Sequence, residues 1–220
     1  MPASYRSPAD VAAVVPVFPL EGALLLPRRQ LPLNVFEPRY LAMVDDALKS
    51  HRLIAVAQPA PDAAEGAPAP ALVRVGCVGR VGQFAETDDG RYLVVLNGIA
   101  RCKIVSEVAT LTPYRLVRVD CDAFAEDFRE EAGADTVDRG ALLAALRGFV
   151  AKRGLEIDWK SVEEASNEAL VNGLAMVSPF GPREKQALLE APDLRTRAEA
   201  LVAMAEIEAD RRAPGGARLQ

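Results

Sequence analysis

The sequence changes character near residue 124, and this change limits what the chain can fold into. Up to that point, short apolar runs rich in β-branched residues are separated by glycines and acidic turns. Beyond it, alanine, leucine and glutamate dominate, and apolar residues recur every three or four positions. This order predicts an α+β chain with a β-rich region over 14–124 and a helical bundle over 125–212.

Composition restricts the class of partner and the compartment. The chain has 220 residues, of which 50% are hydrophobic and 26% charged, which is typical of a folded protein. Its formal net charge of −5 disfavours nucleic acid and anionic membrane as primary partners, because both require a positive surface. The opening segment has too few basic residues for a secretory signal, and no apolar run is long enough to span a membrane. We therefore expect a soluble cytoplasmic protein.

Three local patterns in the first half predict specific structure. Asp88-Asp89-Gly90 lies between two apolar runs and predicts a hairpin turn. The run Tyr92–Leu96 does not alternate with polar residues, so we expect its strand to be covered on both faces. Gly76, Gly79 and Gly82 interrupt strand-like sequence and predict bends or bulges.

Two helices have recognisable starts. Pro38 suits a first helical turn, and Leu41, Val44 and Leu48 form one apolar stripe, which predicts a helix over about 38–49. Ser161 and Glu164 have the spacing of a capping box, which predicts the start of a second helix that continues to Val177, with a possible break near Ser166.

The residues needed for common catalytic and metal sites are scarce. His51 is the single histidine, so any Ser-His or Cys-His pair must include it. Cys77, Cys102 and Cys121 form no C-x-x-C pair, and no glycine precedes a lysine as in a Walker A loop. We therefore predict a protein that is not an enzyme, with no catalytic residue, no metal and no cofactor.

Several blocks resemble a known family. Phe18-Pro19-Leu20, Leu24–Pro27 and the stretch Leu31–Tyr40, which contains Phe-Glu-Pro-Arg-Tyr, resemble the opening of the N-terminal, substrate-binding domain of Lon proteases. Val75–Val81, Asp89–Tyr92 and Gly98–Ile104 resemble its later strands, and Glu184–Glu190 with Arg195 resembles its late helices. The chain resembles a stand-alone Lon N-terminal domain protein.

This resemblance implies a fold and a function. The implied fold is a PUA-like pseudo-barrel of six strands with one helix, followed by a C-terminal helical bundle. The implied function is non-catalytic binding of unfolded or damaged polypeptides, in possible cooperation with a cellular protease. Two alternatives stay open: an adaptor that recruits one specific macromolecule, and, less favoured by the acidic helical half, an RNA-binding PUA-like protein. The oligomeric state is not predicted.

The Phe-Glu-Pro-Arg-Tyr block is expected to act structurally. Glu37 precedes Pro38 at the helix start, where its carboxylate is expected to accept backbone N–H groups and to pair with a base such as Arg101. Phe36 and Tyr40 are expected to anchor the helix to the barrel. The remaining structural positions are Arg39, in the same block, and Gly90, in the hairpin turn.

A client-binding site is predicted in the segment that precedes this block. Pro27 and Pro32 cannot donate to a sheet, so the segment is expected at an edge, where an extended peptide could pair. The candidate residues are Leu24, Leu25, Arg28, Arg29 and Leu31. The leucines would offer apolar surface and the arginines would attract acidic flanks of a client. The alternative is that the barrel and the first helix cover all the leucines.

Overall fold

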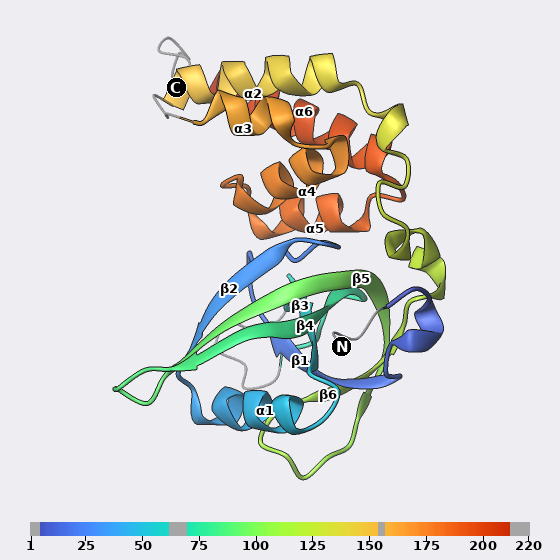
Figure 1. Ribbon diagram of the computed structural model, residues 1–220, viewed down its shortest axis with the longest axis vertical. Helices are drawn as coiled ribbons and strands as arrows, with labels where there is room; N and C mark the ends of the chain where they lie inside the picture. The colour runs from blue at the N-terminus through green and yellow to red at the C-terminus, as the bar shows by residue number, and fades with distance from the viewer. Residues whose placement is uncertain (1–4, 62–69, 154–156, 212–220) are drawn as a thin grey trace, which may run out of the picture. The chain divides into compact units, whose positions relative to one another are not determined.

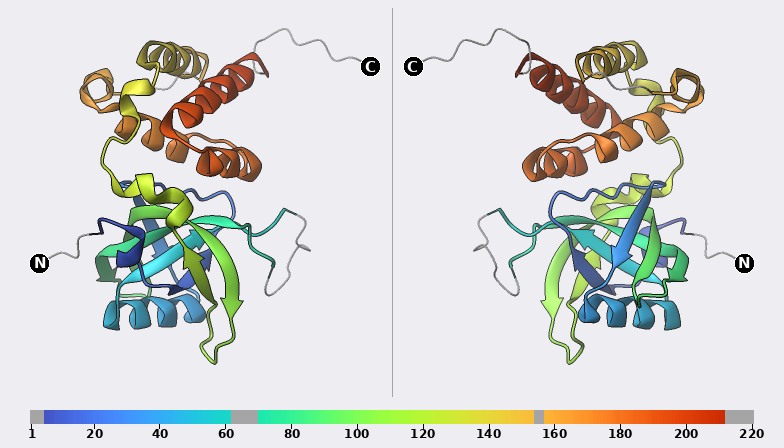
Figure 2. Two further views of the ribbon diagram at one scale, coloured as in Figure 1. Left: turned by 90° about the vertical axis from the view of Figure 1, so that its right-hand side faces the viewer. Right: turned by 90° about the vertical axis from the view of Figure 1, so that its left-hand side faces the viewer.

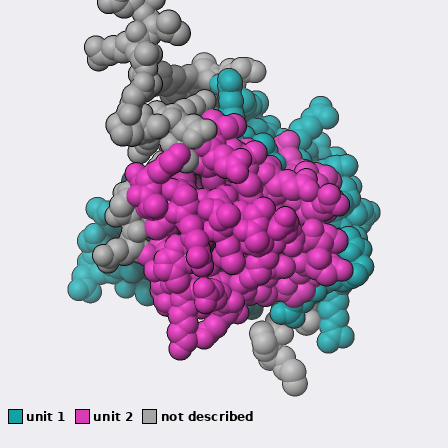
Figure 3. Space-filling view, turned by 90° about the horizontal axis from the view of Figure 1, so that it is seen from above, with its two compact units in different colours: residues 1–130, 179–189 teal, residues 131–178, 190–220 magenta. Residues whose placement is uncertain are grey.

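The computed structural model describes residues 5–61, 70–153 and 157–211, and the chain divides into two compact units (Figure 3). Unit 1 comprises Met1–Glu130 together with Pro179–Leu189, and unit 2 comprises Glu131–Ser178 and Glu190–Gln220. The expectation of an α+β protein is confirmed, since all six strands lie in unit 1, together with some helices, and the described elements of unit 2 are helical.

Unit 1 is built on one mixed sheet of six strands (Figures 1 and 2). The strands are β1 (Val14–Pro19), β2 (Gln30–Val35), β3 (Leu53–Ala57), β4 (Val75–Glu86), β5 (Tyr92–Val108) and β6 (Leu116–Asp120). They pair in the order β2-β5-β4-β3-β1-β6, and β6 also pairs with β5. Five strands therefore close into a barrel, and β2 is added at the edge. The pair β1–β3 is parallel and the others are antiparallel.

The length of β5 explains both the barrel and its extension. Its later part, Lys103–Val108, pairs with β6, whereas Tyr92–Asn97 pairs with β2 on one side and β4 on the other. The three strands β2, β5 and β4 therefore continue beyond the barrel as an arm that ends in the β4–β5 hairpin (Figure 1). Gly90 has a φ of 76° in that turn, which confirms the predicted hairpin. Register shifts at Val78/Gly79 and Val81/Gln83 confirm two of the predicted irregularities.

The barrel interior is apolar and excludes solvent. Its buried cluster consists of Val15, Val17, Leu53, Ala55, Ala57, Val78, Cys102, Val117, Val119 and Cys121. Helix α1 (Pro38–Lys49) has the predicted bounds and buries Tyr40, Met43, Val44 and Ala47. The Tyr40 ring lies 4.3 Å from the Phe18 ring of β1, centroid to centroid. The buried face of α1 includes Val44 from the predicted stripe, whereas Leu41 and Leu48 are only half-buried, so the helix packs through a face that is shifted from the predicted one.

A late segment of the chain belongs to unit 1. Helix α5 (Pro182–Glu190) is held there by Gln58, whose Nε2 donates to the Pro182 carbonyl at 2.9 Å. Gln186 Nε2 in turn donates to the Val75 carbonyl at 3.1 Å. The division differs from the boundary expected at residue 124, because the whole of η2 (Asp122–Phe128) and all of α5 except its last residue lie in unit 1. The short helix η1 (Pro8–Asp10) also belongs to unit 1.

Unit 2 is helical over its described residues. It contains η3 (Ala134–Thr136), α2 (Arg139–Arg153), α3 (Trp159–Glu164), α4 (Asn167–Val177) and α6 (Leu194–Arg211). The predicted capping box at Ser161 is wrong, because Asp158 caps α3 by accepting from Lys160 N and Ser161 N. The chain breaks at Ala165, and the Ser166 side chain caps α4 by accepting from Ala169 N. The possible break near Ser166 is thus confirmed.

Candidate functional site

The predicted exposure of the leucine segment is wrong. Leu24, Leu25 and Leu26 are all buried and form no strand. Two strand glycines explain this burial, since a Cβ added at Gly98 would lie 2.0 Å from the Leu26 carbonyl oxygen. A Cβ added at Gly79 would lie 2.8 Å from a methyl carbon of Leu25. The glycines leave space on β4 and β5, and the leucine segment fills it.

The other members of the predicted client site are half-buried. Arg28 has a positive φ of 59°, and its Nη1 donates to the Asp127 carbonyl at 2.6 Å. Arg29 Nε donates to the Arg28 carbonyl at 3.2 Å, and Leu31 pairs with Leu96 of β5. The two arginines therefore make contacts within unit 1. The expectation that Pro32 marks an edge strand agrees with the position of β2 at the end of the sheet.

The Phe-Glu-Pro-Arg-Tyr block acts differently from the prediction. Glu37 is the residue before α1, but its side chain makes no capping hydrogen bond. Its carboxylate instead pairs with Arg39 at 2.8 Å, and both side chains are more than 40% exposed. Tyr40 anchors the helix as expected, whereas Phe36 is 61% exposed and does not. The predicted Glu37–Arg101 pair is therefore wrong.

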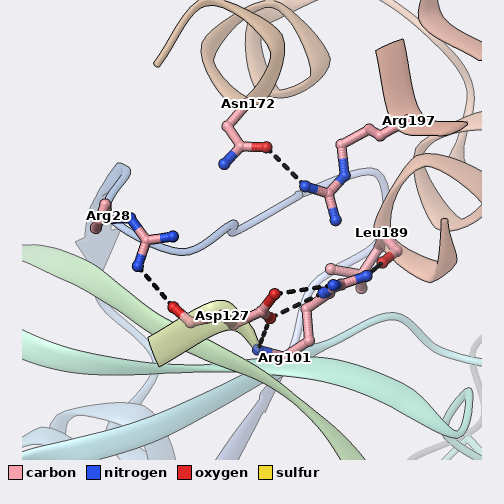
Figure 4. A network of polar contacts seen from close by, with 6 residues as sticks. All are labelled: Arg28, Arg101, Asp127, Asn172, Leu189 and Arg197. Carbon is pink, nitrogen blue, oxygen red and sulfur yellow. Dashed lines mark hydrogen bonds and ion pairs between the residues drawn. The ribbon is translucent and has the colours of Figure 1, made fainter. Parts of the chain in front are cut away.

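Arg101 has another acidic partner, Asp127 of η2 (Figure 4). Arg101 Nε donates to Asp127 Oδ2 at 2.9 Å and Nη2 donates to Oδ1 at 2.8 Å. Arg101 Nη1 also donates to the Leu189 carbonyl at 3.2 Å. Both charged side chains are buried, so the charges satisfy one another away from water. This arrangement joins β5, η2 and the end of α5 and has a structural role.

The arm exposes apolar side chains on one face. Leu93 of β5 is 48% exposed and lies between Asn34 of β2 and Ala85 of β4 in the sheet register. Phe36, just after β2, continues this alternation, as does Pro32, two residues before Asn34. We define the outer face of the arm as Pro32, Asn34, Phe36, Ala85 and Leu93. An exposed sheet face with aliphatic and aromatic residues is typical of a protein-binding surface.

Charged residues surround the end of this face. The Arg91 guanidinium lies 5.7 Å from the centre of the Phe36 ring and pairs with Asp89 at 2.9 Å. A hydrogen bond from the Thr87 hydroxyl lowers the pKa of Asp89, so this carboxylate stays ionised at neutral pH. A shallow hollow of about 310 Å³ lies here, lined by Asn34, Thr87, Asp88, Asp89, Arg91 and Leu93. The outer face thus combines apolar contact area with a predominantly acidic rim.

A second hollow in unit 1, of about 560 Å³, has more polar walls. Its Arg115 side chain pairs with Glu107, and the Tyr114 hydroxyl donates to Asp46 Oδ2 at 2.7 Å. Burial, followed by the bond to Asp46, raises the pKa of Tyr114 to about 12. These polar groups are engaged with one another, so the outer face is the better candidate for binding a partner.

His51 and the three cysteines are the residues that the sequence offers for catalysis or metal binding. His51 Nδ1 accepts a hydrogen bond from Leu53 N at 3.0 Å, and burial lowers the pKa of its imidazole. Burial also raises the pKa of the Cys77, Cys102 and Cys121 thiols, so these thiols stay protonated. Within 5–61, 70–153 and 157–211, no three His, Cys, Asp or Glu residues gather in a way that could hold a metal ion.

Sequence reasoning missed the outer face. The run Tyr92–Leu96 was expected to be covered on both faces, yet Leu93 is exposed because the arm continues past the barrel. Phe84 of β4, 41% exposed on the opposite side of the arm, was also absent from the predicted site residues. One feature of the sequence could have indicated the arm: the strand-like runs before and after Asp88-Asp89-Gly90 are long. Both runs are longer than the strands that a small barrel needs to enclose its core.

A barrel with an added edge strand and an apolar outer face defines a candidate binding module. Residues 14–206 match the family model of the ATP-dependent protease La (LON) substrate-binding domain. The chain belongs to this family.

Similar proteins support the same assignment. Lon protease 2 of Sorangium cellulosum is 29% identical over 92% of this chain and 26% of its own length. Lon protease 2 of Myxococcus xanthus is 28% identical over 86% of this chain and 23% of its own length. The chain thus spans about a quarter of the length of these curated relatives.

Two solved structures share the fold. The Lon N-terminal domain protein from Xanthomonas campestris has a TM-score of 0.61 and 22% identity, covering 87% of this chain and 98% of that one. The N-terminal domain of Mycobacterium avium complex Lon protease has a TM-score of 0.64 and 20% identity, covering 88% of this chain and 98% of that one. The family model names the barrel and helical region as a substrate-binding domain, which agrees with the expected resemblance. None of the helices in the described ranges is both long and apolar enough to cross a membrane.

Proposed function

We propose that the chain binds unfolded polypeptides without catalysing a reaction, and that the outer face of the arm contacts their apolar side chains. The observation that carries this proposal is the exposure of Phe36 and Leu93 on one side of a strand arm, in a protein of the Lon substrate-binding family. An unfolded chain exposes the aliphatic and aromatic residues that a folded protein buries. Such residues would gain contact with Phe36 and Leu93 by leaving water.

A specific pair of variants tests this surface. The probe is reduced and alkylated lysozyme, which stays unfolded, with native lysozyme as the folded competitor. Leu93→Ser is expected to weaken binding of the unfolded probe about tenfold, which corresponds to the transfer free energy of one leucine side chain. Leu111→Ser is the matched control, because Leu111 is fully exposed in the loop between β5 and β6 and lies outside the outer face.

The outcomes separate the alternatives. Binding that distinguishes unfolded from native lysozyme, and that falls only in Leu93→Ser, supports the proposal. Equal binding of the unfolded probe by the two variants would show that the client binds elsewhere than the arm. Failure of the unmodified protein to bind unfolded lysozyme at all, together with recovery of one stoichiometric partner from cytosol, would favour an adaptor.

A further inference from the structure

The arm has two free edges, and their backbones differ. Among the described strands, β3 pairs with β4 only over Cys77–Arg80, so Gln83–Glu86 of β4 pairs with β5 alone. β2 pairs with β5 and with no other described strand. Every residue from Gly82 to Glu86 is exposed. An exposed row of strand backbone is a template for another extended chain.

The hydrogen-bond alternation shows which groups face outward. Thr87 N donates to the Arg91 carbonyl at 2.9 Å, and residues 87 and 91 continue the antiparallel register of Ala85 with Leu93. Because bonded and non-bonded pairs alternate, the main chains of Gln83 and Ala85 face β5. The N–H and C=O groups of Phe84 and Glu86 therefore face away from the arm. The edge thus presents two N–H donors and two C=O acceptors, from residues that are two positions apart in the strand.

The β2 edge is less suited to the same role. Gly98 N donates to the Arg29 carbonyl at 2.8 Å, so by the same alternation Gln30, Pro32 and Asn34 face away from β5. Pro32 stands in the middle of this row and has no N–H to donate. Proline at an outward position is a known means of blocking strand addition. The β4 edge over Phe84–Glu86 contains no proline.

We propose that an extended polypeptide segment binds by adding a strand to the free edge of β4 at Phe84–Glu86. This inference deepens the proposed function and depends on it, since the added strand widens the outer face. In the added strand, residues that hydrogen-bond to Phe84 and Glu86 project to the same side as those two side chains. The residues between them project to the outer face beside Ala85, in line with Leu93.

Charge defines the favoured segment. Neither Glu86 nor Asp88 takes part in an ion pair among the described residues, and both lie at the end of this edge. A basic side chain on the bonded residues of the client would lie beside the Glu86 carboxylate and the Phe84 ring. The favoured client is therefore an extended segment in which aliphatic residues alternate with lysine or arginine.

Backbone N-methylation provides a direct test with two matched probes. The parent probe is a ten-residue fluorescent peptide that alternates valine and lysine. N-methylation of the lysines removes the donors that face β4, whereas N-methylation of the valines alters only the opposite edge of the added strand. We expect the first modification to weaken binding at least tenfold and the second to leave it within about twofold, since main-chain hydrogen bonds supply the affinity in strand addition. Equal affinity for the two modified peptides would overturn the proposal.

Substitutions in the protein, rather than in the peptide, provide a second test of the same edge. Glu86→Pro removes an outward N–H without removing a bond to β5, and Gln30→Pro does the same on the β2 edge. The proposal expects weaker binding of the parent peptide in Glu86→Pro, beyond that of Glu86→Ala, and unchanged binding in Gln30→Pro. Circular dichroism establishes that each variant is folded. Equal effects of the two proline variants would overturn the assignment to β4.

The remaining outcomes show which molecule binds the β4 edge and whether it binds by strand addition. If Leu93→Ser weakens binding while both N-methylated peptides bind equally, the client lies on the outer face without strand addition, and only this inference fails. If the unmodified protein dimerises with concentration and Glu86→Pro abolishes the dimer, the occupant of the edge is a second copy, and the inference fails. Weakening by lysine methylation together with weakening by Glu86→Pro supports it.

Discussion

Arg101 binds both carboxylate oxygens of Asp127 inside unit 1, through Nε at 2.9 Å and Nη2 at 2.8 Å. The main-chain N–H of Arg101 also donates to Asp127 Oδ2 at 2.9 Å. One carboxylate thus fixes the side chain and the backbone of the same strand residue. Since the side chains are only 4% and 9% exposed, neither charge can be compensated by water if the other is removed.

Loss of this pair is expected to be costly. Asp127→Ala should lower the free energy of unfolding by about 3–5 kcal/mol, because it leaves a buried guanidinium without its counter-charge. Urea denaturation at pH 7 measures the change. Glu126→Ala is the control, since Glu126 pairs with Arg129 at the surface and should contribute less than about 1 kcal/mol. Equal midpoints for the two variants would contradict the structural role of Asp127.

Glu37→Ala is expected to change the free energy of unfolding by no more than about 0.5 kcal/mol. The sequence predicted a loss of about 1–3 kcal/mol, the range for a missing cap and an orphaned partner. The structure removes the reason for that loss, since Glu37 caps no N–H group and its pair with Arg39 is exposed. A large fall in the denaturation midpoint would restore the original interpretation.

Two glycine variants should have opposite effects. Gly98→Ala places a Cβ 2.0 Å from the Leu26 carbonyl oxygen, so the buried leucine segment must move, and we expect a loss of more than about 4 kcal/mol. Gly148→Ala lies on an exposed position of α2 with no atom within 4 Å of the new Cβ. It should stabilise the protein by about 0.5–1 kcal/mol through helix propensity. Thermal melting followed by circular dichroism distinguishes the two.

Tyr114 should make the stability pH-dependent in alkaline solution. Its pKa is about 12 in the folded protein, against 10.0 for the unperturbed side chain. The folded state therefore holds this proton more tightly, so its contribution is complete below pH 10 and is lost as the pH rises towards 12. Tyr114→Phe should fall less steeply in stability over this interval. An identical slope for both proteins would show that the proton on Tyr114 is not linked to folding.

The sequence predicted the elements better than it predicted the surfaces they form. The helix at 38–49 and the hairpin at Gly90 follow from local rules, since proline and glycine restrict the backbone wherever they occur. The burial of Leu24–Leu26 depends on Gly79 and Gly98, which are distant in the sequence, so no local pattern could show it. The partner of Arg101 was wrong for the same reason, because Asp127 is 26 residues away on another element.

Because Pro179–Leu189 belongs to unit 1, unit 1 is completed only late in translation. The contacts of Gln58 with Gln186 span 128 residues, and those of Arg101 with Leu189 span 88. The barrel strands are complete at Asp120, yet α5 is translated only after most of the helical unit. During synthesis, Gln58 Nε2 and Arg101 Nη1 therefore lack these acceptors until the chain has passed residue 189, whereas Gln58 Oε1 can already accept from Gly22 N. A fragment that ends at Glu130 would lack the contacts of Gln58 and Arg101 with α5 altogether.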